Sequence, residues 1–117
     1  MEPIQREILL AFWKVHILHH AATRPIYGRW MIEELRRHRF DISPGSLYPI
    51  LARMEEHGWL RASPVSGSGP KARRELTLTP KGASALRKLR RLVAALHREV
   101  VLDAPGGTGP RPRGDDP

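Results

Sequence analysis

The sequence contains no cysteine, which excludes disulfide bridges, thiolate zinc sites and thiol nucleophiles. It also has no long hydrophobic segment. The longest uninterrupted apolar run, Ile8–Trp13, is far short of the roughly 20 residues that a membrane-spanning helix needs. The first residues, Met1–Ile4, lack the basic segment of a secretory signal. We therefore expect a soluble protein of the cytoplasm that makes no membrane contact.

Acidic side chains are in the minority. Lys and Arg number 20 against 12 Asp and Glu, which gives a formal net charge of +8, and the isoelectric point is about 11.0. The segment Asp103–Pro117 carries two Arg and three Asp, so the excess of positive charge belongs to the residues before it. An isoelectric point above about 9 is typical of domains that bind nucleic acid. At 117 residues, 40% of them apolar, the chain fits one small domain with a modest core.

The sequence also lacks the residue patterns of an enzyme. It shows no nucleophile paired with a base, no pair of acids and no cofactor loop. The segment Gly67–Lys71 is rich in glycine, but it does not have P-loop spacing and a strand is expected after it. His16, His19 and His20 recur at helical spacings that could bring two imidazoles to a metal. No Cys or acidic residue lies nearby in sequence, so packing, capping or a subunit contact is the favoured interpretation. We expect neither catalysis nor a metal or other cofactor.

The most informative segment is a short helix with both ends marked. Ser43 can cap its start, Pro44 suits the first helical position, and Gly58 suits the left-handed residue beyond its end. Its two faces differ. The apolar stripe contains Leu47, Ile50, Leu51 and Met54, and the opposite stripe contains Ser46, Pro49 and Arg53, with Tyr48 and Ala52 beside it. A helix with a thin outer face and donors near its start is suited to the major groove of DNA.

The remaining elements surround this helix. The pattern predicts a helix over Pro3–Ala22, a helix over Gly28–His38, and strands over Trp59–Ser63 and Arg74–Thr79 joined by the loop Pro64–Lys71. Thr79 and Pro80 give a cap and a first-turn proline to a last helix that runs to about Leu102. The first helix is apolar on more than one face, so we expect a second subunit as well as its own domain to cover it. Gly82 should cost the last helix some stability.

This order of elements is that of a winged helix-turn-helix with an added dimerisation helix. The predicted fold is mainly α with a small β-hairpin. Residues 1–79 would form the DNA-binding domain with its N-terminal helix, and residues 80–102 the dimerisation helix. Residues 103–117, with four Pro and four Gly, would form a disordered tail.

With these motifs in place, the sequence resembles the PadR family of bacterial transcriptional regulators, in the short form with a single C-terminal helix. The resemblance rests on Pro44–Leu51 followed by Glu55, Glu56 and Gly58, and on Thr79–Gly82, with weaker support from Tyr27-Gly28 and His19–Ala22. It implies a dimer on a roughly palindromic operator, usually a repressor released by a ligand or stress signal. Arg29, Glu75 and Leu76 stand where the family commonly has aromatic residues.

We assign candidate roles to three sets of residues. The predicted DNA contacts are Tyr27, Gly28 and Arg29 at the second helix, Ser46, Tyr48, Pro49 and Arg53 on the recognition helix, and Lys71, Arg73 and Arg74 at the wing. The predicted dimer interface comprises Trp13, Leu86, Leu89, Val93, Leu96 and Val100, of which the last five recur at alternating spacings of three and four. Trp13 and Trp30 could line a pocket for a small aromatic effector.

Each role has a structural alternative. Tyr48 could pack its ring against the second helix, Arg53 could be a solvated surface charge, the wing cations could simply solubilise a hairpin tip, and Trp13 could be plain core. At the level of the whole chain, we favour a homodimeric, sequence-specific transcriptional regulator, most plausibly a repressor. The alternative is a winged-helix module that binds a protein. The positive charge of the folded part and the outward polar residues of the recognition helix speak against that alternative.

Overall fold

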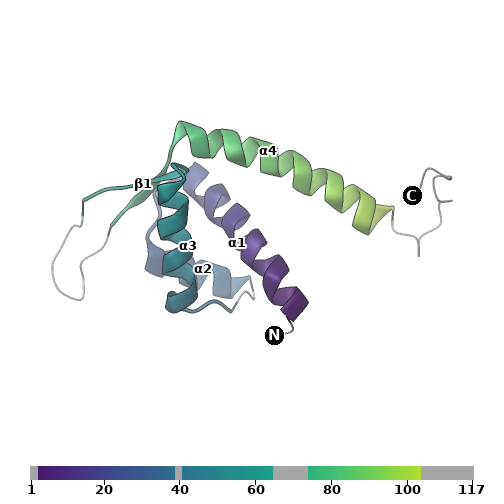
Figure 1. Ribbon diagram of the computed structural model, residues 1–117, viewed down its shortest axis with the longest axis horizontal. Coiled ribbons are helices and arrows are strands. Elements are labelled where there is room, and N and C mark those ends of the chain that lie inside the picture. Colours follow the sequence, from purple (N-terminus) through teal and green to yellow (C-terminus); the bar gives the residue numbers. More distant parts are fainter. Residues whose placement is uncertain (1–2, 39–40, 65–73, 104–117) are drawn as a thin grey trace. The chain divides into compact units, whose positions relative to one another are not determined.

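The computed structural model describes residues 3–38, 41–64 and 74–103 (Figure 1). Its elements, in chain order, are α1 (Pro3–Thr23), α2 (Gly28–Arg37), α3 (Pro44–Glu56), β1 (Leu60–Ala62), β2 (Leu76–Leu78), α4 (Pro80–His97) and the π-helical turn η2 (Arg98–Leu102). This is the predicted order of helices and strands, and the mainly helical class is confirmed. Within the described ranges, no helix is both long and apolar enough to cross a membrane.

The core lies between the three N-terminal helices and the hairpin. Each helix contributes one apolar stripe, because residues three and four apart share a helix face. The buried set is Trp13, Ile17, Leu18 and Ala21 from α1; Met31, Ile32 and Leu35 from α2; Leu47, Ile50, Leu51 and Met54 from α3; Leu60 and Leu76 from the strands; and Ile26, Ile42 and Leu86. The stripe predicted for the recognition helix is therefore buried in full, which fixes the rotation of α3 about its own axis.

The hairpin is shorter than predicted and has an additional partner. Its two antiparallel strands pair Leu60 with Leu78 and Ala62 with Leu76. Ile26 then bridges Leu76 through two reciprocal backbone hydrogen bonds of 2.9 and 2.8 Å, which ties the segment before α2 to the hairpin. Trp59, predicted to begin the first strand, instead donates its backbone N–H to Met54 at the end of α3. The Trp59 amide therefore forms a hydrogen bond at the end of α3 and does not pair in the strand.

The predicted helix ends are confirmed. The Ser43 side chain accepts a hydrogen bond from the Ser46 amide at 3.3 Å, and Gly58 has a positive φ of 80° directly after α3. The Thr79 hydroxyl accepts from the Gly82 amide at 2.9 Å. It also donates to the Gly58 carbonyl, a contact the sequence did not indicate. One threonine therefore caps α4 and holds it to the end of α3.

The chain divides into two compact units, Met1–Leu86 and Arg87–Pro117, with the division inside α4. The sequence had placed the boundary before this helix, at residue 79. The start of α4 belongs to the first unit because Gly82 and Leu86 are buried in its core. In the second unit α4 passes into η2, where the Asp103 amide bonds the Arg98 carbonyl at 2.8 Å, five residues back. The predicted tail lies outside the described residues, apart from Asp103.

Of the described glycines Gly28, Gly45, Gly58 and Gly82, the last makes the closest contact with neighbouring atoms. A Cβ placed there would overlap the carbonyl oxygen of Trp59 and would lie 2.7 Å from Cδ1 of Leu78. Glycine was expected to lower the stability of the last helix. Its lack of a side chain is also what allows α4 to pack onto the end of α3. Overpacking of this kind typically costs about 1–3 kcal/mol, which outweighs the gain of about 1 kcal/mol from replacing a helical glycine with alanine.

We predict that Gly82→Ala lowers the free energy of unfolding by up to about 2 kcal/mol, which is the overpacking cost less the helix gain, measured by urea denaturation. Gly45→Ala is the matched control, because a Cβ at Gly45 would have its nearest neighbour, Oγ of Ser43, at 3.8 Å, an ordinary contact. The control should leave stability unchanged or slightly raised. Equal losses in the two variants would contradict the packing role of Gly82.

Candidate nucleic-acid interface

The outward face of α3 presents the residues that the sequence predicted. Pro49 and Arg53 are exposed and Ser46 is half-buried. The hydroxyl of Ser46 accepts a hydrogen bond from Ser43 at 3.3 Å, which leaves its own proton for another acceptor. Because the opposite stripe of α3 is buried, these groups point away from the core. The helix therefore offers a hydroxyl, an apolar ring and a guanidinium on one surface.

Tyr48 packs against α2, which is the structural alternative considered for it. Its ring lies so close to Gly28 that a Cβ there would be 2.5 Å from Cε1 and 3.0 Å from the phenolic oxygen. Yet 48% of the residue remains exposed. The ring thus packs on the first turn of α2, and glycine at position 28 is what allows that approach. The phenol is held beside the recognition face instead of rotating freely.

The start of α2 is only partly open to solvent, because Tyr27 and Gly28 are half-buried and the Tyr48 ring packs on Gly28. Tyr27 is its N-cap residue, but its side chain makes no capping hydrogen bond, so the first amides of α2 are not capped from that side chain. The N-terminal end of a helix carries partial positive charge and suits a phosphate. Arg29 is exposed next to it. The Tyr27 hydroxyl points elsewhere and donates to Oε2 of Glu75 in the hairpin at 3.2 Å.

Arg74, predicted to contact DNA from the wing, is held at the base of the hairpin. Its guanidinium lies 3.5 Å from the carboxylate of Glu55 on α3, and its Nε donates to the Ser63 carbonyl at 3.3 Å. Sequence reasoning had not assigned either acid, Glu55 or Glu75, a partner in this region. For Glu55 and Arg74 the signal was their opposite charge. The hydrogen bond between Glu75 and the neutral Tyr27 hydroxyl had no such signal. Lys71 and Arg73, the other predicted wing cations, lie outside the described residues.

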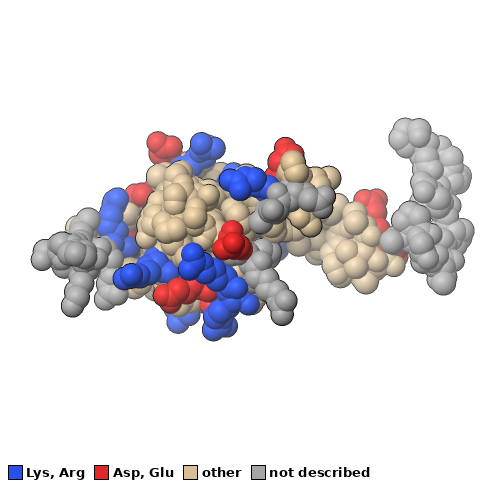
Figure 2. Space-filling model, turned by 90° about the horizontal axis from the view of Figure 1, so that it is seen from below, with Lys and Arg blue, Asp and Glu red and all other residues tan. Residues whose placement is uncertain are grey.

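Positive side chains gather on part of the face drawn in Figure 2, where most of the remaining described surface is neither acidic nor basic. Figure 2 shows Lys and Arg gathered there, with fewer Asp and Glu among them. This distribution is that expected from the formal net charge of +8. It would raise the local concentration of a polyanion and speed its approach.

The residues predicted for a dimer interface fall into two groups. Val93, Leu96 and Val100 are 41%, 52% and 57% exposed, while Leu89 is half-buried. Trp13 and Leu86 are each 2% exposed, so the structure places them in the core of their own chain, where they leave almost no surface for a second copy. The helical pattern marks Trp13 and Leu86 as apolar positions. It cannot distinguish burial within one chain from burial against a second copy.

Further exposed apolar residues were not assigned individually from the sequence. Ile4, Ile8 and Phe12 form a stripe along α1 at spacings of four, and Leu92, Val101 and Leu102 lie in the second unit. The expectation that α1 has apolar residues on more than one side is consistent with this stripe. Each of the two units thus has its own exposed apolar face.

The two tryptophans considered for an effector are both engaged within the chain. Trp13 is buried, and its indole N–H has no hydrogen-bond partner in the described part of the molecule. Trp30 carries the Arg24 guanidinium over its ring at 4.6 Å and meets the edge of the His20 ring at a centroid distance of 5.3 Å. These contacts account for Trp30 without a ligand.

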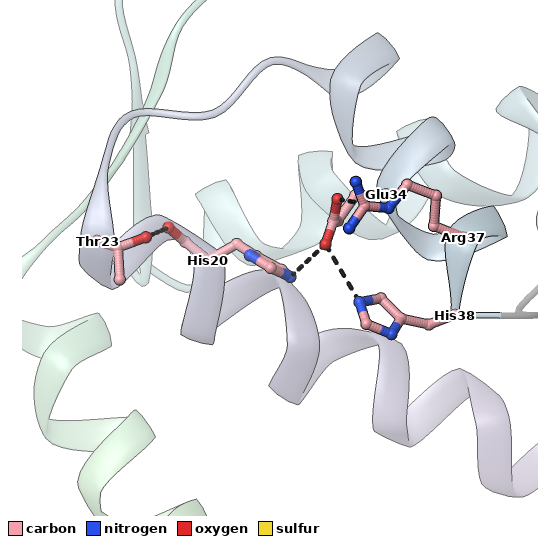
Figure 3. Close-up of polar contacts among 5 residues, drawn as sticks. All are labelled: His20, Thr23, Glu34, Arg37 and His38. Carbon is pink, nitrogen blue, oxygen red and sulfur yellow. Dashed lines mark hydrogen bonds and ion pairs between the residues drawn. The ribbon is translucent and has the colours of Figure 1, made fainter.

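A cluster of imidazoles joins α1 to α2. Figure 3 shows the Glu34 carboxylate facing His20 of α1 and His38 at the end of α2, with Nε2 of these histidines 3.6 and 3.2 Å from Oε2. Arg37 approaches the other oxygen at 3.7 Å. Among the described residues, no group of three or more His, Cys, Asp or Glu has the geometry to hold a metal ion. The spacing of the histidines therefore serves contact between helices.

Burial lowers the pKa of both His16 and His20, and neighbouring imidazoles lower it further, while Glu34 opposes the change. The hydrogen bond from His38 lowers the pKa of Glu34, helped by the positive charge of Arg37. The carboxylate is therefore ionised at neutral pH, whereas His16 and His20 favour the neutral form.

Comparison with known proteins shows the family of this chain. Residues 17–88 match the model of the transcriptional regulator PadR-like family. A protein of Mycobacterium tuberculosis, named transcriptional regulator Rv3488, is 44% identical over 96 residues, which cover 82% of this chain and 89% of that protein.

Solved structures give the same result. A PadR-like transcriptional regulator from Bacillus cereus superposes with a TM-score of 0.75 at 25% identity, covering 86% of this chain and 99% of the other. A PadR-like transcription factor from Bacteroides fragilis gives 0.71 at 26% identity, covering 85% and 96%. The hairpin beside α3 is thus the wing of a winged helix, and the chain belongs to the PadR family of DNA-binding, non-enzymatic transcriptional regulators.

Proposed function

We propose that this chain is a homodimeric repressor that acts in the cytoplasm, binds a roughly palindromic operator, and is released by a ligand or stress signal. The observation that carries the proposal is the geometry of α3. Its apolar stripe is buried in full, while Ser46, Pro49 and Arg53 remain on the outer face. A fixed helix with such a face can enter the major groove.

Each outward side chain has a distinct contact in this proposal. Arg53 can form two parallel hydrogen bonds to guanine, Ser46 can donate to a base or phosphate, and Pro49 can pack on a thymine methyl group. Tyr48, which rests on Gly28, would reach the same groove from a defined position.

Phosphate contacts would fix the register of α3 on the duplex. The partly open start of α2 with Arg29 is one such contact, and the wing with Lys71, Arg73 and Arg74 is another. Arg74 already has Glu55 as a partner at 3.5 Å, so a phosphate would compete with that carboxylate.

A second copy accounts for the exposed apolar faces. Val93 and Leu96 of α4 and Val100 of η2 form one group of exposed apolar residues, which we call the seam. Ile4, Ile8 and Phe12 form another group on α1. Apolar surface of this extent is typical of a subunit interface. Two recognition helices about one DNA turn apart would then each read a half-site. A small aromatic effector at Trp30 would have to displace Arg24 from its ring.

The test is to titrate the full chain onto its own upstream DNA and onto random duplex of equal length, across a salt series. We expect the upstream DNA to bind more tightly at every salt concentration, with both affinities falling as salt rises. Equal binding of both duplexes would leave general nucleic-acid association. No binding to either would favour the protein-interaction module.

Alanine substitutions of Arg53 and Lys71 should affect DNA binding in different ways. We predict that Arg53→Ala reduces discrimination between operator and random duplex by about 1–3 kcal/mol, because it removes a base contact. Lys71→Ala should weaken both duplexes about equally and reduce the salt slope by about 1, because it removes a phosphate contact. Fluorescence anisotropy with both duplexes measures both quantities. The reverse pattern would exchange the two assigned roles.

The proposed dimer interface can be tested by substituting Val93 and Leu96, two exposed residues of the seam. We predict that Val93→Glu combined with Leu96→Glu yields monomers by light scattering, because two charges would have to be buried at the interface. Both residues are exposed within one chain, so the folding of the chain itself should be preserved.

The matched control is Ala94→Glu with Ala95→Glu. These residues are exposed on other sides of the same helix, so the control should keep the dimer mass. A dimer mass unchanged in the seam variant would place the interface elsewhere.

A further inference from the structure

The imidazoles between α1 and α2 have no role in the DNA contacts or in the exposed seam. We call His16, His19, His20, Glu34 and His38 the histidine cluster. The rings of His16 and His20 stack at a centroid distance of 5.4 Å, His16 and His38 lie 5.2 Å apart, and His19 meets His20 at 5.0 Å. Four titratable rings from two helices therefore lie in one chain of contacts.

The charge balance of the cluster changes when it is protonated. The charged groups that act on His16 and His20 are the other imidazoles, Glu34 from α2, and Arg24 from the segment after α1. Glu34 is the carboxylate in this set, and it also faces Arg37 at 3.7 Å. A single negative charge cannot balance several imidazolium rings together with two guanidinium groups.

The position of His20 increases this cost. Its Nε2 is buried and lies 3.6 Å from the Glu34 carboxylate, beyond hydrogen-bonding distance. A proton on this nitrogen would be attracted by the Glu34 carboxylate without a hydrogen bond to it, and would be repelled by the imidazoles of His19 and His38 and by Arg24. Burial and these like charges therefore oppose protonation of His20 in the folded chain.

We propose that the histidine cluster is an acid-sensitive joint, in which protonation loosens α1 from α2 and weakens DNA binding. The link to DNA runs through α2. Gly28 of α2 supports the ring of Tyr48 beside the recognition face, and the buried stripes of α2 and α3 share one core. The stability part of this inference stands alone, and the DNA part rests on the proposed function.

The direction of the effect follows from linkage. The folded-state pKa of His16 and His20 lies below the ordinary value of 6.5, so the unfolded or opened chain binds more protons than the folded one near that pH. Their contribution to stability is therefore present above pH 6.5 and is lost as the pH falls through the folded-state pKa.

The effect on DNA binding opposes the simple electrostatic expectation. Protonating histidines adds positive charge, which by itself strengthens binding to a polyanion. A chain whose DNA affinity falls on acidification must therefore lose structure that the interface needs. This difference in sign makes the experiment decisive.

The test compares the wild-type chain with His16→Gln/His20→Gln at pH 7.5 and 5.5, at equal ionic strength. Urea midpoints and the affinity for upstream DNA are measured for each. We expect both the wild-type urea midpoint and the wild-type affinity for upstream DNA to fall on acidification. The double variant should lose less than half as much in both measurements.

The matched control is His57→Gln/His97→Gln, which removes two histidines outside the cluster. His57 stacks on Trp59 at 4.5 Å, and His97 ends α4. This control should keep the wild-type response to pH. Identical pH responses in the cluster variant and the wild type, or tighter wild-type DNA binding at pH 5.5, would overturn the proposal.

A second measurement covers the case in which the cluster variant fails to fold. Histidine NMR titration of the wild-type chain should give midpoints for His16 and His20 below 6.5, and midpoints at or above that value would also overturn the proposal. A chain that binds no duplex at pH 7.5 would instead refute the proposed function, while the urea and NMR results would still decide the stability part.

Discussion

The contact on which the first unit depends is the close approach of α4 to the end of α3. The Gly82 backbone lies against the Trp59 carbonyl, with no room for a Cβ, and Thr79 bonds both the Gly58 carbonyl and the Gly82 amide. The recognition helix, both strands and the last helix all begin or end within a few residues of this point. The end of α3 is therefore fixed by backbone contacts, and its buried stripe fixes its rotation.

Carboxylates link the elements of this small, basic protein. Glu55 joins α3 to Arg74 at the wing, Glu75 accepts from Tyr27 before α2, and Glu34 faces histidines from α1 and α2. Exposed ion pairs add little stability, but each of these fixes where a polar side chain points. Arg29 and Arg53, in contrast, remain exposed. Their guanidinium groups are therefore accessible to an external anion.

The helix α1 shows why one amphipathic pattern can support several roles. Trp13, Ile17 and Leu18 enter the core, Ile4, Ile8 and Phe12 stay exposed, and the histidines contact α2 on a further side. A helix with apolar residues on more than one side must be covered on more than one side. In our proposal, this makes α1 the element that connects the dimer contact to the DNA-reading helices.

The sequence by itself determined the order of elements, the caps at Ser43 and Thr79, the buried stripe of α3 and the family, because these depend on local spacing and on residue types that suit particular backbone positions. It could not determine partners that are distant in the chain. The packing of Tyr48 on Gly28, the engagement of Tyr27 and Arg74 by acids, and the burial of Trp13 and Leu86 within one chain were decided by tertiary structure. The physical reason is that periodicity shows which side of a helix is apolar, whereas only the folded chain shows what covers that side.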